Sequence, residues 1–312
     1  MNLIIYQGVS GLENGQQLEY HEVSIKDLQK KCLEILVYFK EFCEKHNLLF
    51  YFCGGCCIGA IRHQGFVPWD DDIDVFMPRA DYERLKKLWA EEADTEKYAY
   101  CRSDQGHYLR SLLTAITDED TTFIKERQRD LDIQHGVRLE ILPLDGCPKS
   151  RWARKFQIMW ALLYSMFNNN EAPTSKGKGF YILGRFLLAL APSQKMRYRV
   201  WRFAEKKMSQ YPITPETQYI TELCARYKYM VNQYPAEIFA KAEWVDFEGL
   251  KMPVPAGYDT YLKMAFGDYM QLPPEEDRVP AHEAVKIDLD HSYKIYKGKY
   301  YCVAGKEKNA KE

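Results

Sequence analysis

The sequence lacks a charge excess of either sign, and this absence limits the partners that long-range attraction can bring to the protein. Its 312 residues carry 43 Lys and Arg against 44 Asp and Glu, so the formal net charge is −1. Proteins that coat nucleic acid need a clear basic excess to neutralise phosphates. We therefore expect no nucleic-acid partner. An anionic substrate must then be held by a local device such as a metal ion, a helix N-terminus or a few arginines.

The sequence also lacks an apolar segment long enough to cross a membrane. The longest apolar run, residues 180–191 with the sequence FYILGRFLLALA, is interrupted by Arg185, and a transmembrane helix needs about 20 apolar residues. This run favours a buried helix over one that lies on a membrane surface. The start of the chain has no basic segment followed by an apolar core, so we expect no signal peptide and a cytoplasmic protein.

Cysteine is present in a number that indicates no disulfide framework. Nine is an odd count, and without an export signal the thiols are expected to be reduced. Cys53 and Cys56 form a CxxC pair, which suits a redox couple, and with Cys57 they suit part of a zinc site. The sequence has no further paired Cys or His at zinc-ligand spacing, and a redox couple gives no role to the acidic cluster that follows. We predict small, buried apolar residues.

Hydrophobic periodicity predicts an α+β fold. A capping Ser24 opens an amphipathic helix that ends near residue 46, and a second helix is expected over residues 80–93. Strands are expected over residues 48–53, 72–77, 98–101, 112–116, 121–124 and 137–146. A glycine break after the first strand leads into a helix over residues 56–63. Residues 151–211 are predicted to be helical, and the last third to form a hairpin, a short helix and a Pro-rich loop.

This pattern, together with the motifs described below, predicts four regions along the chain. Residues 1–150 are expected to form the catalytic core with its N-terminal helix, and residues 151–235 a helical region rich in aromatic and basic side chains. Residues 236–290 are expected to complete the active site with a hairpin, a helix and a loop. Residues 291–312 are expected to form a C-terminal tail.

A cluster of four aspartates is the strongest chemical signal. Asp70, Asp71, Asp72 and Asp74 lie within five residues of one another. On a strand Asp72 and Asp74 point to the same face, because side chains alternate with period two. Two carboxylates on one face suit Mg²⁺ or Mn²⁺, which bridge phosphate oxygens and neutralise developing charge. The alternative is a solvated acidic turn, against which the alternation with apolar residues argues.

Two further features extend this hypothesis. Glu140, on the strand over residues 137–146, faces away from Leu139 and Ile141; it either completes a metal site, accepts a proton from an acceptor hydroxyl, or is an exposed Glu paired with its neighbour. Asp145 is better explained as a turn residue. Gly54–Gly55 would let backbone N–H groups approach phosphate oxygens closely, aided by the following helix N-terminus.

These segments resemble the LicD family, which is related to fukutin and fukutin-related protein. The first segment, YFCGGCCIGAIRHQGFVPWDDDIDVFMPRADYERL, matches the family signature through Gly54–Gly55, Arg62–His63, the run from Pro68 to Asp74, and Met77–Pro78–Arg79. HGVRLEILPLDG is similar to the second motif, and FGDYMQLPPEEDR followed by His282 to the C-terminal one. The resemblance extends from Tyr51 to His282 and is least specific in the helical middle.

The resemblance implies a nucleotidyltransferase-type mixed sheet flanked by helices, with a helical insertion. It also implies a transferase that uses Mg²⁺ or Mn²⁺. A phosphorylated alcohol, most often phosphocholine, would move from its CDP-activated form to a hydroxyl of a cell-surface glycan or its precursor, as in lipopolysaccharide or teichoic acid synthesis, releasing CMP. Asp72 and Asp74 would be metal ligands, Glu140 the third acid, and Gly54–Gly55 the phosphate-side loop.

Other residues in these motifs are candidates for substrate contacts. Asp70 and Asp71 would hydrogen-bond within the loop around the site. Arg62 and Arg278 would neutralise phosphate charge, with surface arginines as the alternative, and His282 would contact donor or acceptor, with a structural role as the alternative.

Several functions stay open on the sequence alone. The transferred group could be ribitol or glycerol phosphate, and a nucleotidyltransferase of the same fold would release pyrophosphate instead of CMP. A non-catalytic glycan-binding protein would bind no metal. Whether the acceptor is lipid-linked, and whether the protein contacts the inner face of the membrane as a peripheral protein, is also open.

Overall fold

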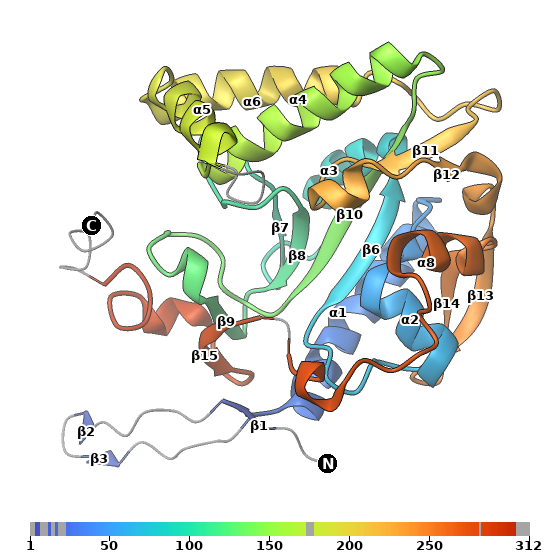
Figure 1. Cartoon of the computed structure of the whole chain (residues 1–312). Helices are drawn as coiled ribbons and strands as arrows, with labels where there is room; N and C mark the ends of the chain where they lie inside the picture. The colour runs from blue at the N-terminus through green and yellow to red at the C-terminus, as the bar shows by residue number, and fades with distance from the viewer. Residues whose placement is uncertain are drawn as a thin grey trace.

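The computed structural model describes residues 4–6, 12–13, 16–17, 23–172, 178–280 and 282–303. Figure 1 shows strands gathered into a mixed central sheet with helices around it. This arrangement confirms the predicted α+β class. The finer prediction, a sheet of nucleotidyltransferase type, stays a prediction.

The elements follow the predicted order through most of the described chain. The helices are α1 (Ile25–Lys45), α2 (Gly54–His63), α3 (Arg79–Glu92), α4 (Arg151–Asn169), α5 (Lys178–Ala189), α6 (Gln194–Met208), α7 (Tyr227–Met230) and α8 (Tyr258–Phe266). The central sheet contains β5 (Tyr51–Phe52), β6 (Ile73–Pro78), β7 (Tyr98–Cys101), β8 (Thr114–Asp118), β10 (Arg138–Gly146), β11 (Tyr219–Glu222) and β12 (Tyr234–Pro235). Two-stranded pairs join β1 (Ile4–Tyr6) to β4 (Val23–Ser24), β2 (Leu12–Glu13) to β3 (Gln16–Gln17), β9 (Thr122–Lys125) to β15 (Ala284–Asp288), and β13 (Ala242–Phe247) to β14 (Leu250–Pro255).

Strand β10 lies at the centre of the sheet and determines which side chains meet. It runs parallel to β6, with Glu140 beside Asp74. Its other edge pairs antiparallel with β8 and then with β11, where Leu144 lies beside Glu222. Residues paired across neighbouring strands point to the same face, as do residues an even number apart along one strand. This register therefore places Asp74, Glu140 and Glu222 on one face.

The opposite face of the sheet packs against α1 and α3. The predicted cap of α1 is confirmed, because the Ser24 hydroxyl oxygen accepts a hydrogen bond from the Asp27 N–H at 3.2 Å. Leu139 and Ile141 alternate with Glu140 and are fully buried in the main core. Trp89 of α3 joins them there. The predicted division of β10 into an apolar and a polar face is thus confirmed.

Helix α2 begins at Gly54, two residues before the predicted start. The glycine pair is therefore the first turn of the helix rather than a separate break before it, and Cys53 is the N-cap residue. Gly54 has φ +50°, a conformation that glycine adopts without strain. The last residues of α2 pack closely on the following loop, where a Cβ at Gly59 would lie 2.4 Å from the Gly65 carbonyl oxygen.

The predicted hairpin is confirmed as β13–β14. Its turn residues, Glu248 and Gly249, have φ values of 49° and 78°, as a tight two-residue hairpin turn requires. Phe247 is fully buried and its ring lies 4.7 Å from that of Phe52. The Glu248 carboxylate accepts a hydrogen bond from the Phe66 N–H at 3.1 Å. The hairpin thereby supports the loop that precedes the aspartate cluster.

A buried ion-pair network joins α3, the sheet and α6. Asp145 was predicted to be a turn residue, but it lies within β10 and is fully buried. Arg79 donates two hydrogen bonds to its carboxylate, at 2.8 and 2.7 Å. Glu205 of α6, also buried, lies 3.9 Å from Arg79 and 2.7 Å from Arg102. The prediction for Asp145 was wrong because its partner lies 66 residues away in sequence.

Helices α4, α5 and α6 form a separate layer at the top of Figure 1. Ala161, Tyr164 and Trp201 belong to a second hydrophobic cluster between α4 and α6. The prediction that residues 180–191 form a buried helix was wrong, because α5 leaves Ile182 and Phe186 largely exposed. No helix in the described part of the chain is long and apolar enough to span a bilayer.

Candidate active site

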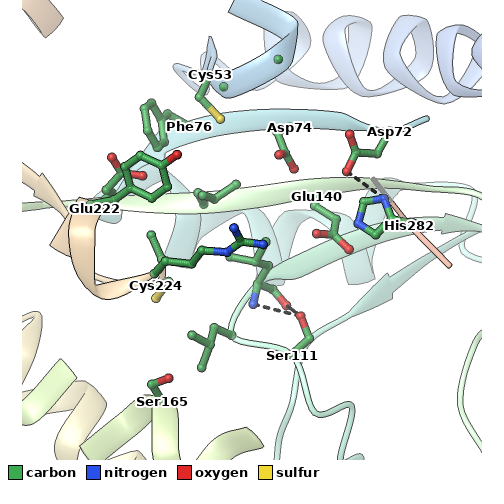
Figure 2. A pocket seen from close by; sticks show the side chains of 18 of the residues that line it. Cys53, Asp72, Asp74, Phe76, Ser111, Glu140, Ser165, Glu222, Cys224 and His282 are labelled. Carbon is green, nitrogen blue, oxygen red and sulfur yellow. Dashed lines mark hydrogen bonds and ion pairs between the residues drawn. The ribbon is translucent and has the colours of Figure 1, made fainter. Parts of the chain in front are cut away.

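A cavity of about 830 Å³ opens on the polar face of the sheet. Its walls come from β6, β10, β11, the start of α2 and the C-terminal half of α4. Figure 2 shows Asp72, Asp74, Glu140 and His282 on one side of this cavity, and Phe76 with Glu222 on the other. The structure thus brings the three predicted acids and His282 together, although they come from segments far apart in the sequence. Gly54 and Gly55 also line the cavity.

Asp71 is buried, while Asp70, Asp72 and Asp74 are partly exposed. Partial burial is the main cause of the raised pKa values of the last three. It raises the pKa of Asp72 to about 6, against the opposing effect of His282 and with the repulsion of Glu140 and Asp71. The pKa of Asp74 is raised well above its usual range by burial and by Asp72 and Glu140. Burial and its acidic neighbours do the same to the pKa of Asp70. The neighbouring basic side chains therefore do not neutralise all of the negative charge of this cluster.

Glu140 differs from the aspartates because it has a cationic partner. The Lys125 ammonium of β9 donates a hydrogen bond to its carboxylate at 3.0 Å, and both side chains are buried. Burial alone would raise the pKa of Glu140, but Lys125, Arg138 and His282 outweigh burial and lower it to about 2. A carboxylate that is held ionised in this way is a weak proton acceptor near neutral pH. This favours metal binding or positioning over general-base catalysis for Glu140.

His282 is held in place by the aspartate cluster. Its Nδ1 lies 3.0 Å from an Asp71 oxygen and 3.5 Å from an Asp72 oxygen, and its backbone N–H donates to Asp71 at 3.2 Å. A carboxylate can only accept hydrogen bonds, so Nδ1 carries the proton and Nε2 is left as an acceptor. Asp71 thus has the loop hydrogen-bonding role that the sequence predicted, and it orients the imidazole.

The donor set suits a divalent cation. In the described residues, Asp71, Asp72 and His282 offer ligand atoms that all lie within 4.8 Å of one another. The Asp74 Oδ1 atom is buried and has no hydrogen-bond partner among the described residues. An uncompensated buried carboxylate oxygen is costly unless a cation accompanies it. The residues therefore fit a Mg²⁺ or Mn²⁺ site, while the ligand set of Asp72, Asp74 and Glu140 stays a prediction.

The start of α2 is surrounded by carboxylates. A Cβ at Gly55 would lie 2.2 Å from Asp70 Oδ2, and a Cβ at Gly54 would lie 3.9 Å from Asp74 Oδ2. The Gly54 N–H already donates to the Tyr261 hydroxyl at 3.0 Å. The partial positive charge of the helix N-terminus therefore acts first on these acids. Direct contact between the glycine pair and a phosphate stays a prediction.

The two predicted phosphate-binding arginines lie away from the cavity lining. Arg62 donates to the Tyr269 carbonyl oxygen at 2.8 Å, and Arg278 donates to the Pro273 carbonyl oxygen at 2.9 Å. The basic side chains that line the cavity are Lys125, Arg127 and Arg226. Sequence reasoning missed these three residues because none of them lies in a recognisable motif.

An aromatic wall forms the side of the cavity opposite the acids. Phe76, Tyr229, Tyr261 and Phe266 line it, and the rings of Tyr261 and Phe76 are 5.4 Å apart. Glu222 lies among them and accepts a hydrogen bond from the Tyr234 hydroxyl at 2.5 Å. Burial, only partly offset by that hydrogen bond, raises the pKa of Glu222 to about 7. No motif marks these residues, and the register of β10 with β11 is what brings Glu222 to the site.

The predicted role of the CGGCC cysteines as buried apolar residues is confirmed. Cys53, Cys56 and Cys57 are at most 2 % exposed. Burial raises the pKa of each thiol. The thiolate needed for redox chemistry is therefore disfavoured at all three positions.

We expect Gly55→Ala to destabilise the protein by about 1–3 kcal/mol, because the added methyl group would overlap the Asp70 carboxylate. Thermal unfolding measures this change. Gly179→Ala in α5 is the matched control, since a Cβ there meets nothing within 4 Å. Gly55→Ala combined with Asp70→Ala should recover most of the loss. A Gly55→Ala variant as stable as the control would contradict this account.

The chain is similar to known proteins over different lengths. Residues 47–131 match the family model described as LicD/FKTN/FKRP, nucleotidyltransferase domain. The chain is similar to the lipopolysaccharide cholinephosphotransferase LicD of Haemophilus influenzae, with 31% identity over 268 residues that cover 84% of this chain and 97% of that protein. It is also similar to the uncharacterized protein RP689 of Rickettsia prowazekii, with 31% identity over 97 residues, 28% of this chain and 36% of that protein. The chain therefore belongs to the LicD family.

Proposed function

We propose that the protein transfers phosphocholine from CDP-choline to a hydroxyl of a cell-surface glycan or its precursor and releases CMP. One observation carries this proposal: a single cavity has an acid cluster on one side and an aromatic wall with a buried carboxylate on the other. The family relationship supports it, because one similar protein is named a lipopolysaccharide cholinephosphotransferase. The cavity is also large enough for a nucleotide-linked substrate.

The acid side would hold the diphosphate through a cation. A bound Mg²⁺ or Mn²⁺ would supply positive charge that offsets charge developing on the diphosphate. Asp72 and Asp74 would hold it, with Glu140 nearby and kept ionised by Lys125. Lys125, Arg127 and Arg226 would contact the phosphates directly, since these are the basic residues on the cavity wall. In this proposal they take the place that the sequence gave to Arg62 and Arg278.

His282 is our candidate for receiving the proton of the acceptor hydroxyl. Asp71 holds its Nδ1–H, so Nε2 is the atom with a free lone pair. The Asp71 contact also stabilises the imidazolium that forms, as a carboxylate does in other acid–base dyads. Glu140 suits this task less well because its pKa is lowered to about 2.

The aromatic side would select a quaternary ammonium group. Aromatic faces attract cations, and the attraction is strongest where water is excluded. Glu222 adds a carboxylate among the rings of Phe76, Tyr229 and Tyr261. Neither ribitol nor glycerol carries a positive charge that this carboxylate could bind. The charge and shape of this side therefore favour choline among the three alcohols.

The proposal is tested by incubating the protein with Mg²⁺, an acceptor glycan and one donor at a time: CDP-choline, CDP-ribitol, CDP-glycerol or CTP. We expect CMP release with CDP-choline, and none without the divalent cation. Phosphocholine on the recovered glycan would complete the proof. CMP release with only CDP-ribitol or CDP-glycerol would show that ribitol phosphate or glycerol phosphate is transferred instead of phosphocholine. Pyrophosphate release from CTP would indicate a nucleotidyltransferase. Failure to bind any donor, even by thermal shift, would indicate a non-catalytic protein.

Glu222→Gln should raise the KM for CDP-choline about tenfold or more, because the amide keeps the shape but loses the charge that faces the ammonium group. The change in kcat should be small. Glu237→Gln, an exposed carboxylate on the neighbouring η2 turn (Ala236–Phe239), is the matched control. Equal KM values for the Glu222 variant and wild type would exclude this role.

The same residue predicts a pH dependence. With a pKa of about 7 in the free protein, Glu222 is about 90 % ionised at pH 8 and about 10 % at pH 6. Because the ionised form attracts the ammonium group, the ratio of kcat/KM for CDP-choline to that for CDP-glycerol should fall about fivefold to ninefold as the pH is lowered from 8 to 6. The ratio cancels the titration of the acids that both donors share. A Glu222→Gln variant should show a flat ratio.

A further inference from the structure

Helix α5 exposes apolar side chains that no other described part of the chain covers. Ile182, Leu183 and Phe186 are 66%, 52% and 59% exposed, and Leu190 just beyond the helix is 59% exposed. These residues are large and adjacent on a helix, so they form a patch rather than single exposed side chains. Contiguous apolar patches on soluble domains mark binding surfaces.

Two other helices of the same layer also expose aromatic side chains. Trp152 and Phe156 of α4 are 71% and 57% exposed, and Phe203 of α6 is 52% exposed. The ring of Phe203 lies 5.4 Å from that of Trp160, so α4 and α6 present aromatic residues on a shared side. Exposed aromatic side chains of this kind are enriched where proteins meet the interfacial region of a bilayer.

The same helices carry a strong positive charge. Residues 151–208 contain twelve Lys and Arg against two acidic residues, whereas the whole chain has 43 against 44. Neither acid lies on the exposed side of these helices. Glu205 is buried in the network with Arg102, and Glu171 lies just beyond the end of α4. Among the basic residues that the structure describes here, seven are exposed: Arg151, Lys155, Lys178, Arg185, Lys195, Arg199 and Lys206.

A small cavity beside the patch concentrates part of this charge. It has a volume of about 330 Å³ and lies between α5 and the start of α6. Arg185 and Arg197 both line it, together with Tyr181 and Asn170. Two guanidinium groups with a phenol and an amide suit an anionic oxygen group such as a phosphate.

We propose that α5, with the exposed sides of α4 and α6, docks on the surface of an anionic lipid bilayer. The apolar side chains enter the interfacial region, the basic residues pair with lipid phosphates, and Arg185 with Arg197 holds one headgroup. Apolar side chains bordered by Lys and Arg are the composition of helices that lie in the plane of a membrane. This inference does not depend on the proposed function.

A second copy of the chain fits this surface less well. In a two-fold symmetric interface the same patch meets itself. The exposed basic residues of the two copies would then face one another, and like charges across an interface oppose association. An anionic bilayer removes that repulsion and accommodates the apolar residues at the same time.

The test is co-sedimentation of the full chain with phosphatidylcholine vesicles that contain either no anionic lipid or one third phosphatidylglycerol. We expect the affinity to be at least about tenfold higher for the anionic vesicles and to weaken as salt is raised. Ile182→Ser, Leu183→Ser and Phe186→Ser combined should weaken binding about tenfold or more. The control combines Met264→Ser, Leu272→Ser and Ile295→Ser, which are also exposed but lie elsewhere; it should bind as wild type.

A second set of variants, which removes positive charge, tests the proposal independently of the serine variants. Arg185→Gln, Lys195→Gln and Arg199→Gln combined should abolish the preference for anionic vesicles, whereas Lys30→Gln, Lys86→Gln and Lys241→Gln combined should not. Circular dichroism checks folding, and if the serine variant unfolds, the charge variants decide the question. The proposal would be overturned if wild type bound anionic and neutral vesicles with equal affinity, or if the α5 variants bound as tightly as wild type. A dimer in light scattering that the serine variant dissociates, without vesicle binding, would assign the face to a second copy instead.

Discussion

Asp74→Asn is expected to reduce the rate of CMP release by about a thousandfold or more while leaving the protein at least as stable as wild type. Asp74 has a buried carboxylate oxygen with no hydrogen-bond partner among the described residues, and its neighbours include Asp72 and Glu140. In the metal-free protein the charge is therefore a source of repulsion. Asparagine keeps the shape and removes that repulsion, but it also removes a cation ligand. Activity and stability should thus change in opposite directions.

Single-turnover CMP release and thermal unfolding with and without Mg²⁺ measure both changes. Mg²⁺ should raise the unfolding temperature of wild type and raise that of Asp74→Asn much less, because a ligand stabilises only the form that binds it. Asp246→Asn, an exposed aspartate on the hairpin, serves as the control and should change neither quantity. Near-normal turnover of Asp74→Asn, or an undiminished response to Mg²⁺, would rule out the role assigned to Asp74.

Arg79→Met is expected to lower the free energy of unfolding by about 3–5 kcal/mol, the largest effect on stability that we predict. Arg79 donates two hydrogen bonds to Asp145, which is fully buried. Removing the arginine leaves a buried carboxylate without its main counter-charge, and it leaves Glu205 with one cationic neighbour fewer. Because the network joins α3, β10 and α6, the helical layer should also loosen from the sheet.

Urea unfolding of the variant gives this free energy. Arg84→Met on the same helix removes an exposed ion pair with Asp81, and it should cost less than about 1 kcal/mol. Arg79→Met combined with Asp145→Leu should recover part of the stability, since replacing both members of a buried pair avoids the unpaired charge. A cost for Arg79→Met no larger than that of Arg84→Met would show that the pair contributes little.

Local sequence patterns correctly predicted those features of the fold that depend on residues close together in the sequence. The periodicity of α1 and its Ser24 cap, and the alternation of β10, gave the correct elements and faces. The acidic cluster at the start of β6 lies beside Glu140, as the order of motifs and their resemblance to a known family led us to expect. Such signals lie within a few residues of each other, so a single sequence contains them.

The residues that the sequence did not predict depend on contacts between distant segments. Lys125 is one lysine at the end of a short strand, and only its contact with Glu140 marks it as part of the site. Glu222 reaches the cavity through strand register. Arg62 lies in one of the recognised motifs, but its guanidinium group donates to the carbonyl oxygen of Tyr269 in a loop. The exposed face of α5 was missed because an apolar run indicates a helix without saying what covers it.

The cavity draws its lining from Cys53 at one extreme to Glu283 at the other. During translation the aspartate cluster leaves the ribosome long before His282 does, so the nascent chain carries acids whose partner has not yet been synthesised. A prematurely terminated product would lack the imidazole and, if shorter still, the aromatic wall. The cavity can thus assemble in full only after residue 283 has been synthesised.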